Sequence, residues 1–335
     1  MGLPRFSPHA AHRASQALLV LLVLTVFSGA AVRLTGSGLA CPEWPQCNDQ
    51  VITASTPQWI EFGNRLVSGA IGMVSVFVFV VMLRRAPRDS TLLRISALPP
   101  IGMAAEGALG VVTVTTHLSP GLVIAHFLLA FLILVACALL VWRSSHPAGS
   151  RPLATDRVAV WSVRALLPLV SLLVVIGALA SGAGPHPGSA ATGEVVNRIN
   201  WFGGETLRTL ILRHGHLGTA TLILTAIVLF VLWRRRAPQP LLTRVAALIG
   251  VYAIQGAVGL YQYYNGLPAE VVWVHIALAT IVWVLVLFAV FEAGRLEPRA
   301  LRERLVNSPS PATSQAPADL GAVWSAPPPR DSGSR

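Results

Sequence analysis

Apolar residues form eight long runs along the chain, separated by shorter polar or proline-containing segments. Each run is long enough to cross a hydrocarbon core of roughly 30 Å as a helix rising about 1.5 Å per residue. The runs lack the alternating polarity that is typical of barrel strands. The pattern therefore predicts eight transmembrane helices, at Ala17–Val32, Leu66–Leu83, Leu93–Val114, Leu122–Trp142, Ala165–Ala180, Leu217–Trp233, Leu242–Tyr261 and Val271–Phe291.

Composition agrees with a membrane protein. Hydrophobic residues make up 54% of the chain and charged residues 12%, whereas soluble domains average about 25% charged residues. The formal net charge of +11 would otherwise suggest nucleic-acid binding. The basic residues are all arginines and stand in short clusters between apolar runs, a distribution that fixes membrane topology and excludes a nucleic-acid partner.

The arginine clusters predict the orientation. They follow the second, fourth and sixth runs, whereas the short connections after the third and seventh runs carry none. Because arginine is enriched in cytoplasmic loops, we expect both termini to face the cytoplasm, in a multi-pass protein of the cell membrane. The residues of the three clusters are Arg84, Arg85, Arg88 and Arg94; Arg143, Arg151 and Arg157; and Arg234, Arg235, Arg236 and Arg244.

The chain contains an internal repeat. Glu106-Gly-Ala-Leu-Gly110 precedes His126 by twenty residues, and Gln255-Gly-Ala-Val-Gly259 precedes His275 by the same interval. The fold class predicted is therefore an all-α integral membrane protein of two pseudo-symmetric four-helix bundles, which commonly hold cofactors between facing helices. A duplication is also found in transporters, so the repeat alone does not decide the function.

Histidines at repeat-related positions are the strongest candidates for chemistry. His126 and His275 lie early in the fourth and eighth spans, His214 and His216 lie near the entrance of the sixth, and Asn64 holds the corresponding place in the second. In the predicted orientation all of them lie towards the outer side. A lone histidine near a helix end is often only interfacial, but several at equal depth on facing helices favour axial ligation of haem iron.

Repeat spacing distinguishes the two histidines of the sixth span. Asn64 and His126 are 62 positions apart, His214 and His275 are 61 apart, and His216 and His275 are 59 apart. The spacing favours His214 as the partner of His275. Positions 214 and 216 do not share a helix face, so they are not expected to bind the same iron.

Two further features lie on the outer side. Cys41 and Cys47 follow the first span, in an oxidising compartment where a disulfide is expected; its role is either structural or redox. Glu61 shares a helix face with Asn64 and Arg65. A carboxylate there either serves the reaction at the haem site or pairs with Arg65. Arg65 in turn either binds a haem propionate or snorkels at the interface.

These segments resemble haem A synthases, the membrane enzymes of cytochrome oxidase assembly. The resemblance runs from about residue 15 to 295, and the cysteine loop is its most specific part. One departure is that Asn64 stands where the family usually has histidine. The segments that carry the resemblance are the loop Arg33–Cys47, Glu61-Phe-Gly-Asn-Arg65, Leu118–His126, Ser181–His186 and Gly266–His275.

The resemblance implies an oxidoreductase that converts a methyl group of haem O to a formyl group, giving haem A. It implies haem b ligation by His214 and His275, with His126 facing the substrate haem O. Glu61 would match the catalytic carboxylate, and Cys41 and Cys47 the family's loop pair. With Asn64 a poor iron ligand, His126 would hold the substrate haem alone, unless His117 or His186 moved in.

The resulting organisation has two working halves. The sequence leaves the electron donor or acceptor, the oxygen source and any homo-oligomer open; the expected partners are membrane lipid, haem O and the enzyme that produces haem O. A b-type electron-transfer cytochrome and a haem carrier are the alternative functions. The predicted segments are a cytoplasmic N-terminus 1–14, a first half 15–145 with its outer loop 33–60, a linker 146–163, a second half 164–295 and a disordered cytoplasmic tail 296–335.

Overall fold

The computed structural model describes residues 5–41, 43, 46–47, 55–146 and 153–296. The predicted tail, apart from residue 296, and parts of the predicted N-terminus, outer loop and linker lie outside these residues. Within them, eight helical spans are long and apolar enough to cross a membrane, and they contain all eight predicted runs. The prediction of an all-α, eight-span membrane protein is confirmed.

Six spans are single helices and two are interrupted. The third span comprises α3 (Ser90–Ser96) and α4 (Leu98–Thr115), and the fifth comprises α6 (Arg157–Arg164) and α7 (Leu166–Ala183). Proline just after each break, at Pro99 and Pro168, lacks the N–H that a continuous helix requires. The single helices are α1 (Pro8–Leu34), α2 (Thr56–Leu83), α5 (Pro120–Ser145), α8 (Thr206–Arg234), α9 (Gln239–Tyr264) and α10 (Ala269–Glu292).

Local sequence explains where several helices begin. The Ser7 hydroxyl accepts a hydrogen bond from the backbone N–H of Ala10 at 3.2 Å, and Pro8 follows at the first helical position. Ser55 and Gln58 form a capping box at the start of α2. Asp89 and Asp156 cap α3 and α6 through backbone N–H groups. These side chains satisfy donors that a helix leaves open at its first turn.

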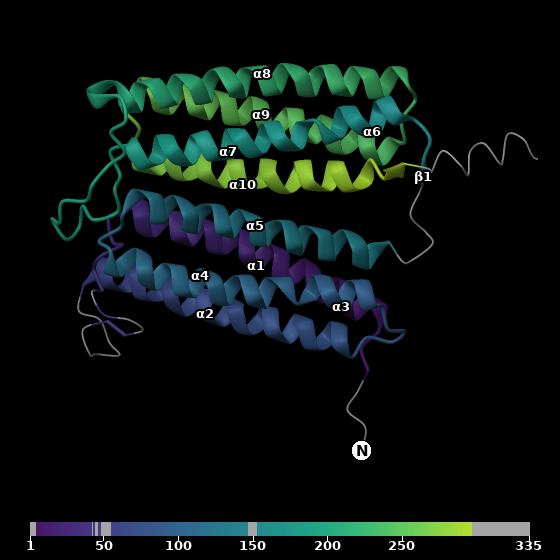
Figure 1. The fold of residues 1–335 in the computed structure, drawn as a ribbon, viewed down its shortest axis with the longest axis horizontal. Coiled ribbons are helices and arrows are strands. Elements are labelled where there is room, and N and C mark those ends of the chain that lie inside the picture. Colours follow the sequence, from purple (N-terminus) through teal and green to yellow (C-terminus); the bar gives the residue numbers. More distant parts are fainter. Residues whose placement is uncertain (1–4, 42, 44–45, 48–54, 147–152, 297–335) are drawn as a thin grey trace, which may run out of the picture. The chain divides into compact units, whose positions relative to one another are not determined.

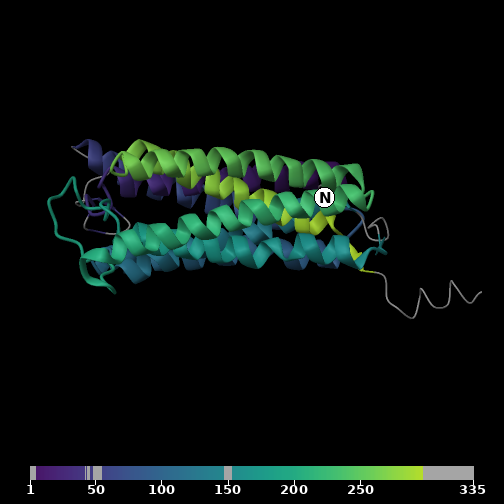
Figure 2. The same ribbon diagram turned by 90° about the horizontal axis from the view of Figure 1, so that it is seen from above.

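The two halves repeat the same helix contacts. In the first half α1 contacts α2, α2 contacts α4 and α4 contacts α5; in the second, α7 contacts α8, α8 contacts α9 and α9 contacts α10. The halves meet where α1 and α5 contact α10, and α5 also contacts α7. Figure 2 shows the same helices from above, running roughly alongside one another. A minimal parallel pairing of β1 (Leu153–Ala154) with β2 (Arg295–Leu296) completes the described structure.

Indole groups bridge the two halves. The Trp283 N–H donates to the carbonyl oxygen of Phe131 at 3.0 Å, and the two rings lie 5.9 Å apart. The Trp273 N–H donates to the carbonyl oxygen of Phe27 at 2.9 Å. Because water is absent from a bilayer core, such interhelical hydrogen bonds together with close packing hold helices in place.

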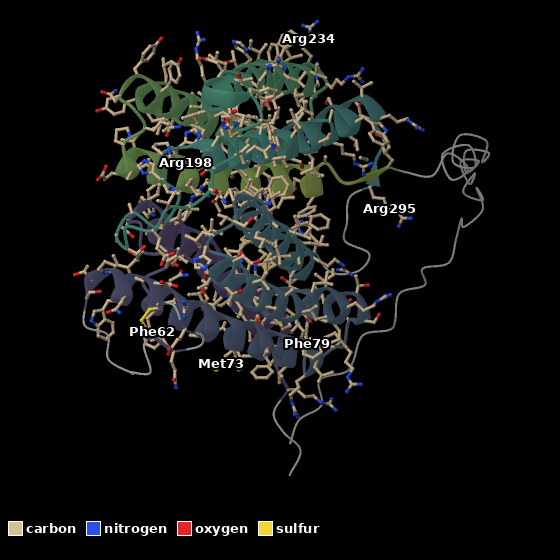
Figure 3. The ribbon with its side chains drawn as sticks, turned by 60° about the vertical axis from the view of Figure 1, so that its left-hand side comes forward. Phe62, Met73, Phe79, Arg198, Arg234 and Arg295 are labelled. Carbon is tan, nitrogen blue, oxygen red and sulfur yellow. A yellow bond between two sulfur atoms is a disulfide. The ribbon has the colours of Figure 1, made fainter. Side chains whose placement is uncertain are left out.

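Large apolar side chains cover the outward faces of the helices. Met73 of α2 is 70% exposed and points away from the helices (Figure 3), and Ile101 and Phe230 are 65% and 59% exposed. On a water-soluble protein such surfaces would promote aggregation. On eight long apolar helices they form the surface that faces lipid.

Candidate functional site

Two histidines of the second half face each other between α8 and α10. The ring centroids of His214 and His275 lie 6.0 Å apart, with their planes inclined by 62°. An imidazole nitrogen binds a transition metal at about 2.0–2.1 Å, so two rings on opposite faces of one iron have centroids roughly 6 Å apart. The pair therefore fits the axial ligation of a haem by both residues.

His216 does not join this pair. Its side chain is exposed, whereas His214 is partly buried on the same helix. The reason is the helical geometry, since residues two positions apart point to different faces. The structure also shows α8 beginning at Thr206, so both histidines lie within the helix and not at its entrance. The sequence placed this span only from Leu217 because the segment from Arg213 to His216 interrupts the apolar run.

Glycines on neighbouring helices make room for the imidazole rings. A Cβ atom at Gly177 of α7 would lie 2.9 Å from Cε1 of His214, and one at Gly259 of α9 would lie 3.2 Å from Cε1 of His275. In the first half, a Cβ at Gly110 of α4 would lie 3.5 Å from the ring of His126. Gly110 and Gly259 are repeat-related, so both halves reserve the same space beside a histidine.

Replacing Gly177 by alanine is expected to push the His214 ring from its place and lower the amount of low-spin haem in purified protein. The added methyl group is too close to a ring packed between helices, and overpacking of this kind costs about 1–3 kcal/mol. Visible spectra of detergent-purified protein measure the effect. Gly256→Ala is the matched control, because a Cβ there meets no atom within 4 Å. Equal haem content in both variants would contradict the packing argument.

Two of the positions at which the first half differs from the second concern the histidines. Asn64 replaces a histidine, and its side-chain oxygen accepts a hydrogen bond from the Ser28 hydroxyl at 2.7 Å. Glu106 stands where the second half has Gln255, and its Oε1 lies 3.4 Å from Nδ1 of His126. Gln255 instead donates to the backbone carbonyl of His275 at 3.1 Å. The two repeat-related sites are therefore chemically different.

Glu61 is buried and holds the cysteine loop against α2. Its carboxylate accepts hydrogen bonds from the backbone N–H of Cys41 at 2.8 Å and from Arg65 at 2.5 Å. Arg65 also donates to the carbonyl oxygens of Cys41, Glu43 and Gln46. The pairing of Glu61 with Arg65, one of the two alternatives, is thus present. Binding of a propionate through Nη1 or Nη2 of Arg65 would require exchange of these partners.

A disulfide joins Cys41 and Cys47 in this loop, and both residues are buried. Figure 3 shows the sulfur–sulfur bond near Phe62 of α2. The remaining cysteine, Cys137, is reduced and buried in α5, in keeping with a packing residue. The disulfide lies close to Glu61, and the same end of the fold carries the first turns of α5 and α10.

The double variant Cys41→Ala and Cys47→Ala is expected to fold and insert normally. The bond closes a loop of only six positions, so its contribution to the free energy of unfolding is about 2–3 kcal/mol, and the helices pack without it. Detergent gel filtration and helix content by circular dichroism provide the measurement. Loss of the folded protein would show that the disulfide is structural; a folded variant with reduced turnover would indicate a redox role.

Two other histidines have partners elsewhere. Nδ1 of His117 lies 3.2 Å from a carboxylate oxygen of Glu194, and the ring of His186 contacts the carbonyl oxygen of Leu267 at 2.8 Å. Neither contact involves Asn64 or His126. This geometry does not favour either residue as a replacement for the missing histidine of the first half.

Sequence reasoning assigned no role to Glu106, Ser28 or the glycines beside the imidazoles. The signal for Glu106 was available, because a carboxylate inside an apolar run is costly and by default functional. The glycines gave no usable signal, since their meaning depends on which side chain a neighbouring helix presents. In the described residues no group of three or more histidine, cysteine, aspartate or glutamate side chains forms a metal cluster; axial haem ligation uses at most two.

The fold and the site together define a class: duplicated multi-pass membrane proteins with histidines between facing helices. Residues 13–287 match the model of the COX15-CtaA family, described as cytochrome oxidase assembly protein. The match covers most of the chain, and the protein therefore belongs to this family.

Individual relatives extend the comparison. The chain is 28% identical over 210 residues to a haem A synthase of Shewanella oneidensis, covering 55% of this chain and 60% of that protein. It is 28% identical over 327 residues to a haem A synthase of Paracoccus denitrificans, covering 81% and 84%. It is also 28% identical over 301 residues to a protoheme IX farnesyltransferase of Thermus thermophilus, covering 86% of this chain but only 49% of that protein. The chain thus spans about half to three fifths of the first relatives it matches.

Proposed function

We propose that this protein is a haem A synthase, an oxidoreductase that converts a methyl group of haem O to a formyl group. Membership of the cytochrome oxidase assembly family and similarity to proteins named haem A synthase support the proposal. The observation that carries it is the difference between the two halves. The second half has a facing pair of histidines, and the first half has His126 with Asn64 at the repeat-related place.

The two halves would divide the work. His214 and His275 would hold a permanent haem b in the half formed by residues 164–295, and a haem with both axial positions filled supplies electron transfer and not substrate chemistry. His126 would hold the substrate haem O in the half formed by residues 15–145. Asparagine is a poor iron ligand, so the opposite iron face stays accessible.

The chain's own residues would position the substrate and exclude water. Conversion of methyl to formyl brings in one oxygen atom by successive hydroxylations of the carbon. With water as the oxygen source the protons and electrons removed from the carbon pass to an external acceptor; with dioxygen each hydroxylation takes electrons from an external donor. Glu61, whose carboxylate accepts hydrogen bonds from Arg65 and Cys41, would accept a proton when one of these bonds is exchanged. In the structure the bonds of Glu61 and Arg65 link Cys41, Glu43 and Gln46 to the first turns of α2.

The orientation proposed is a cell-membrane protein with cytoplasmic termini and haem sites towards the outer side. Supporting this, the cysteine loop precedes α2, while the arginines that end α2 and α8 lie at the opposite ends of those helices. A haem O-producing enzyme is the partner proposed. In its support, a region matching most of this chain forms about half of the Thermus protoheme IX farnesyltransferase.

Pigment extraction tests the activity directly. The chain is co-expressed with a source of haem O under aeration. The extracted haems are separated by chromatography and identified by mass spectrometry. Haem A is the expected product, and its absence from cells containing folded protein would refute the proposal. An electron-transfer cytochrome would show a quinone-linked redox change without altering the haem side chain. A carrier would bind and release haem unchanged.

A further inference from the structure

Glu106 is a carboxylate inside the membrane-spanning part of α4. Its neighbours in sequence are Met103-Ala-Ala before it and Gly-Ala-Leu after it, and its side chain is only 15% exposed. Charged groups at such positions are costly unless they are paired or face a functional cavity. The ion-pair partner that the described structure offers Glu106 is His126 of α5.

The contact brings together two side chains that each carry a buried polar atom without a hydrogen bond in the described residues. Oε1 of Glu106 lies 3.4 Å from Nδ1 of His126. Within the described residues, Nδ1 of His126 and Oε2 of Glu106 are buried without a hydrogen bond. A small rotation of either side chain brings Nδ1–H and the carboxylate within hydrogen-bonding distance. The arrangement thus offers an acceptor for one imidazole nitrogen and leaves the other free.

The second half provides an internal comparison. Gln255 occupies the repeat-related position, and its amide donates to the backbone of His275, not to the ring. Nδ1 of His275 is buried without a hydrogen-bond partner in the described residues. The half with two facing histidines has a neutral amide, and the half with one histidine has a carboxylate. Asn64 and Glu106 are thus two differences that both concern the histidines of the repeat: one removes a histidine and the other places a carboxylate beside the histidine that remains.

We propose that Glu106 is a positioning residue that accepts a hydrogen bond from Nδ1–H of His126 and so presents Nε2 of that ring as the single axial ligand of the first-half haem. The inference rests on the proposed function. A carboxylate behind a ligating imidazole fixes its tautomer and orientation and increases its electron donation to the metal. That support compensates for the ligand that Asn64 does not supply.

Haemin titration of the purified full-length chain tests the proposal. With His126 as its single ligand, the first-half haem is expected to be high-spin. Glu106→Leu should weaken haemin binding at this site by about 10–100-fold, the usual effect of losing such a support, and should raise the midpoint potential of that haem. Glu106→Gln keeps an acceptor and should recover most of the affinity. The low-spin signal of the second half should stay unchanged in both variants. Gln255→Leu is the matched control and should leave the high-spin species unaltered.

A second measurement avoids dependence on the folding of Glu106→Leu. In the ferrous wild-type protein, resonance Raman spectroscopy reports the iron–histidine stretching frequency, which rises when Nδ1–H is hydrogen-bonded to a carboxylate. The expected result is a higher frequency in wild type than in Glu106→Gln. Equal frequencies, or wild-type haemin affinity in Glu106→Leu, overturn the role of Glu106. A wild-type protein that binds only low-spin haem likewise overturns the single-ligand role given to His126 and Glu106. The proposed function itself is overturned by the absence of haem A from the pigment extract, so the two failures are distinguishable.

Discussion

Replacing His275 by alanine is expected to abolish the low-spin haem spectrum of the purified protein. The His275 ring lies opposite His214 at the distance that axial ligation by both requires, and no other imidazole is close to it in the described structure. Loss of a group that merely supports a ligand costs about 10–100-fold in metal affinity, and removal of the ligand should cost at least as much. Optical spectra and haem content per chain provide the measurement.

His216→Ala is the matched control for this experiment. His216 lies on α8 two residues from His214, but its side chain is exposed. The control variant should retain the full low-spin signal. If His275→Ala keeps the wild-type spectrum, or if His216→Ala loses it, the assignment of the ligand pair is wrong.

Replacing Asn64 by histidine is expected to convert the first-half haem from high-spin to low-spin, so that the low-spin haem per chain rises to about twice its wild-type amount. The substitution restores the residue that the second half has at His214. The α1 residue that contacts Asn64 is Ser28, and at the next residue, Gly29, an added Cβ would meet no atom within 4 Å. Gly29-Ala30 corresponds in the repeat to Gly177-Ala178, and Gly177 packs against His214.

Electron paramagnetic resonance of the ferric protein follows this conversion, since high-spin and low-spin haem give distinct signals. Ser28→Ala is the control: it removes the hydrogen bond to Asn64 without adding a ligand, and should leave the spin state as it is. A high-spin signal that persists at full strength in a folded Asn64→His variant would show that position 64 does not lie opposite His126.

The sequence predicted the spans well because a segment that crosses lipid must satisfy its backbone hydrogen bonds within itself. A long apolar run has few alternatives to a helix in a bilayer, and the run lengths and repeat were visible directly. The residues at which helices begin and end were harder to predict from the sequence. Thr206–Leu217 is mixed in polarity, yet it extends α8 by three turns, because amphipathic residues at the membrane interface can continue a helix that the apolar pattern does not mark.

The candidate site was predictable where chemistry and repeat spacing coincide. The choice of His214 over His216 followed from spacing, and the structure places His214 beside His275. The contacts of Glu61 with both Arg65 and the backbone of Cys41 were only half predictable. The bond to Arg65 follows from helical spacing, whereas the bond to Cys41 depends on how a loop twenty residues away returns to α2.

The hydrogen bond between Trp273 and Phe27 connects α10 of the second half to α1 of the first half. Trp273 precedes His275 by two residues, and Phe27 precedes Ser28, whose hydroxyl bonds to Asn64. A continuous path of covalent and hydrogen bonds thus runs from α10, which carries His275, to Asn64 in the other half. If α10 tilts when the proposed haem b binds, Asn64 is therefore expected to shift with it, and binding in the second half would change the geometry of the first.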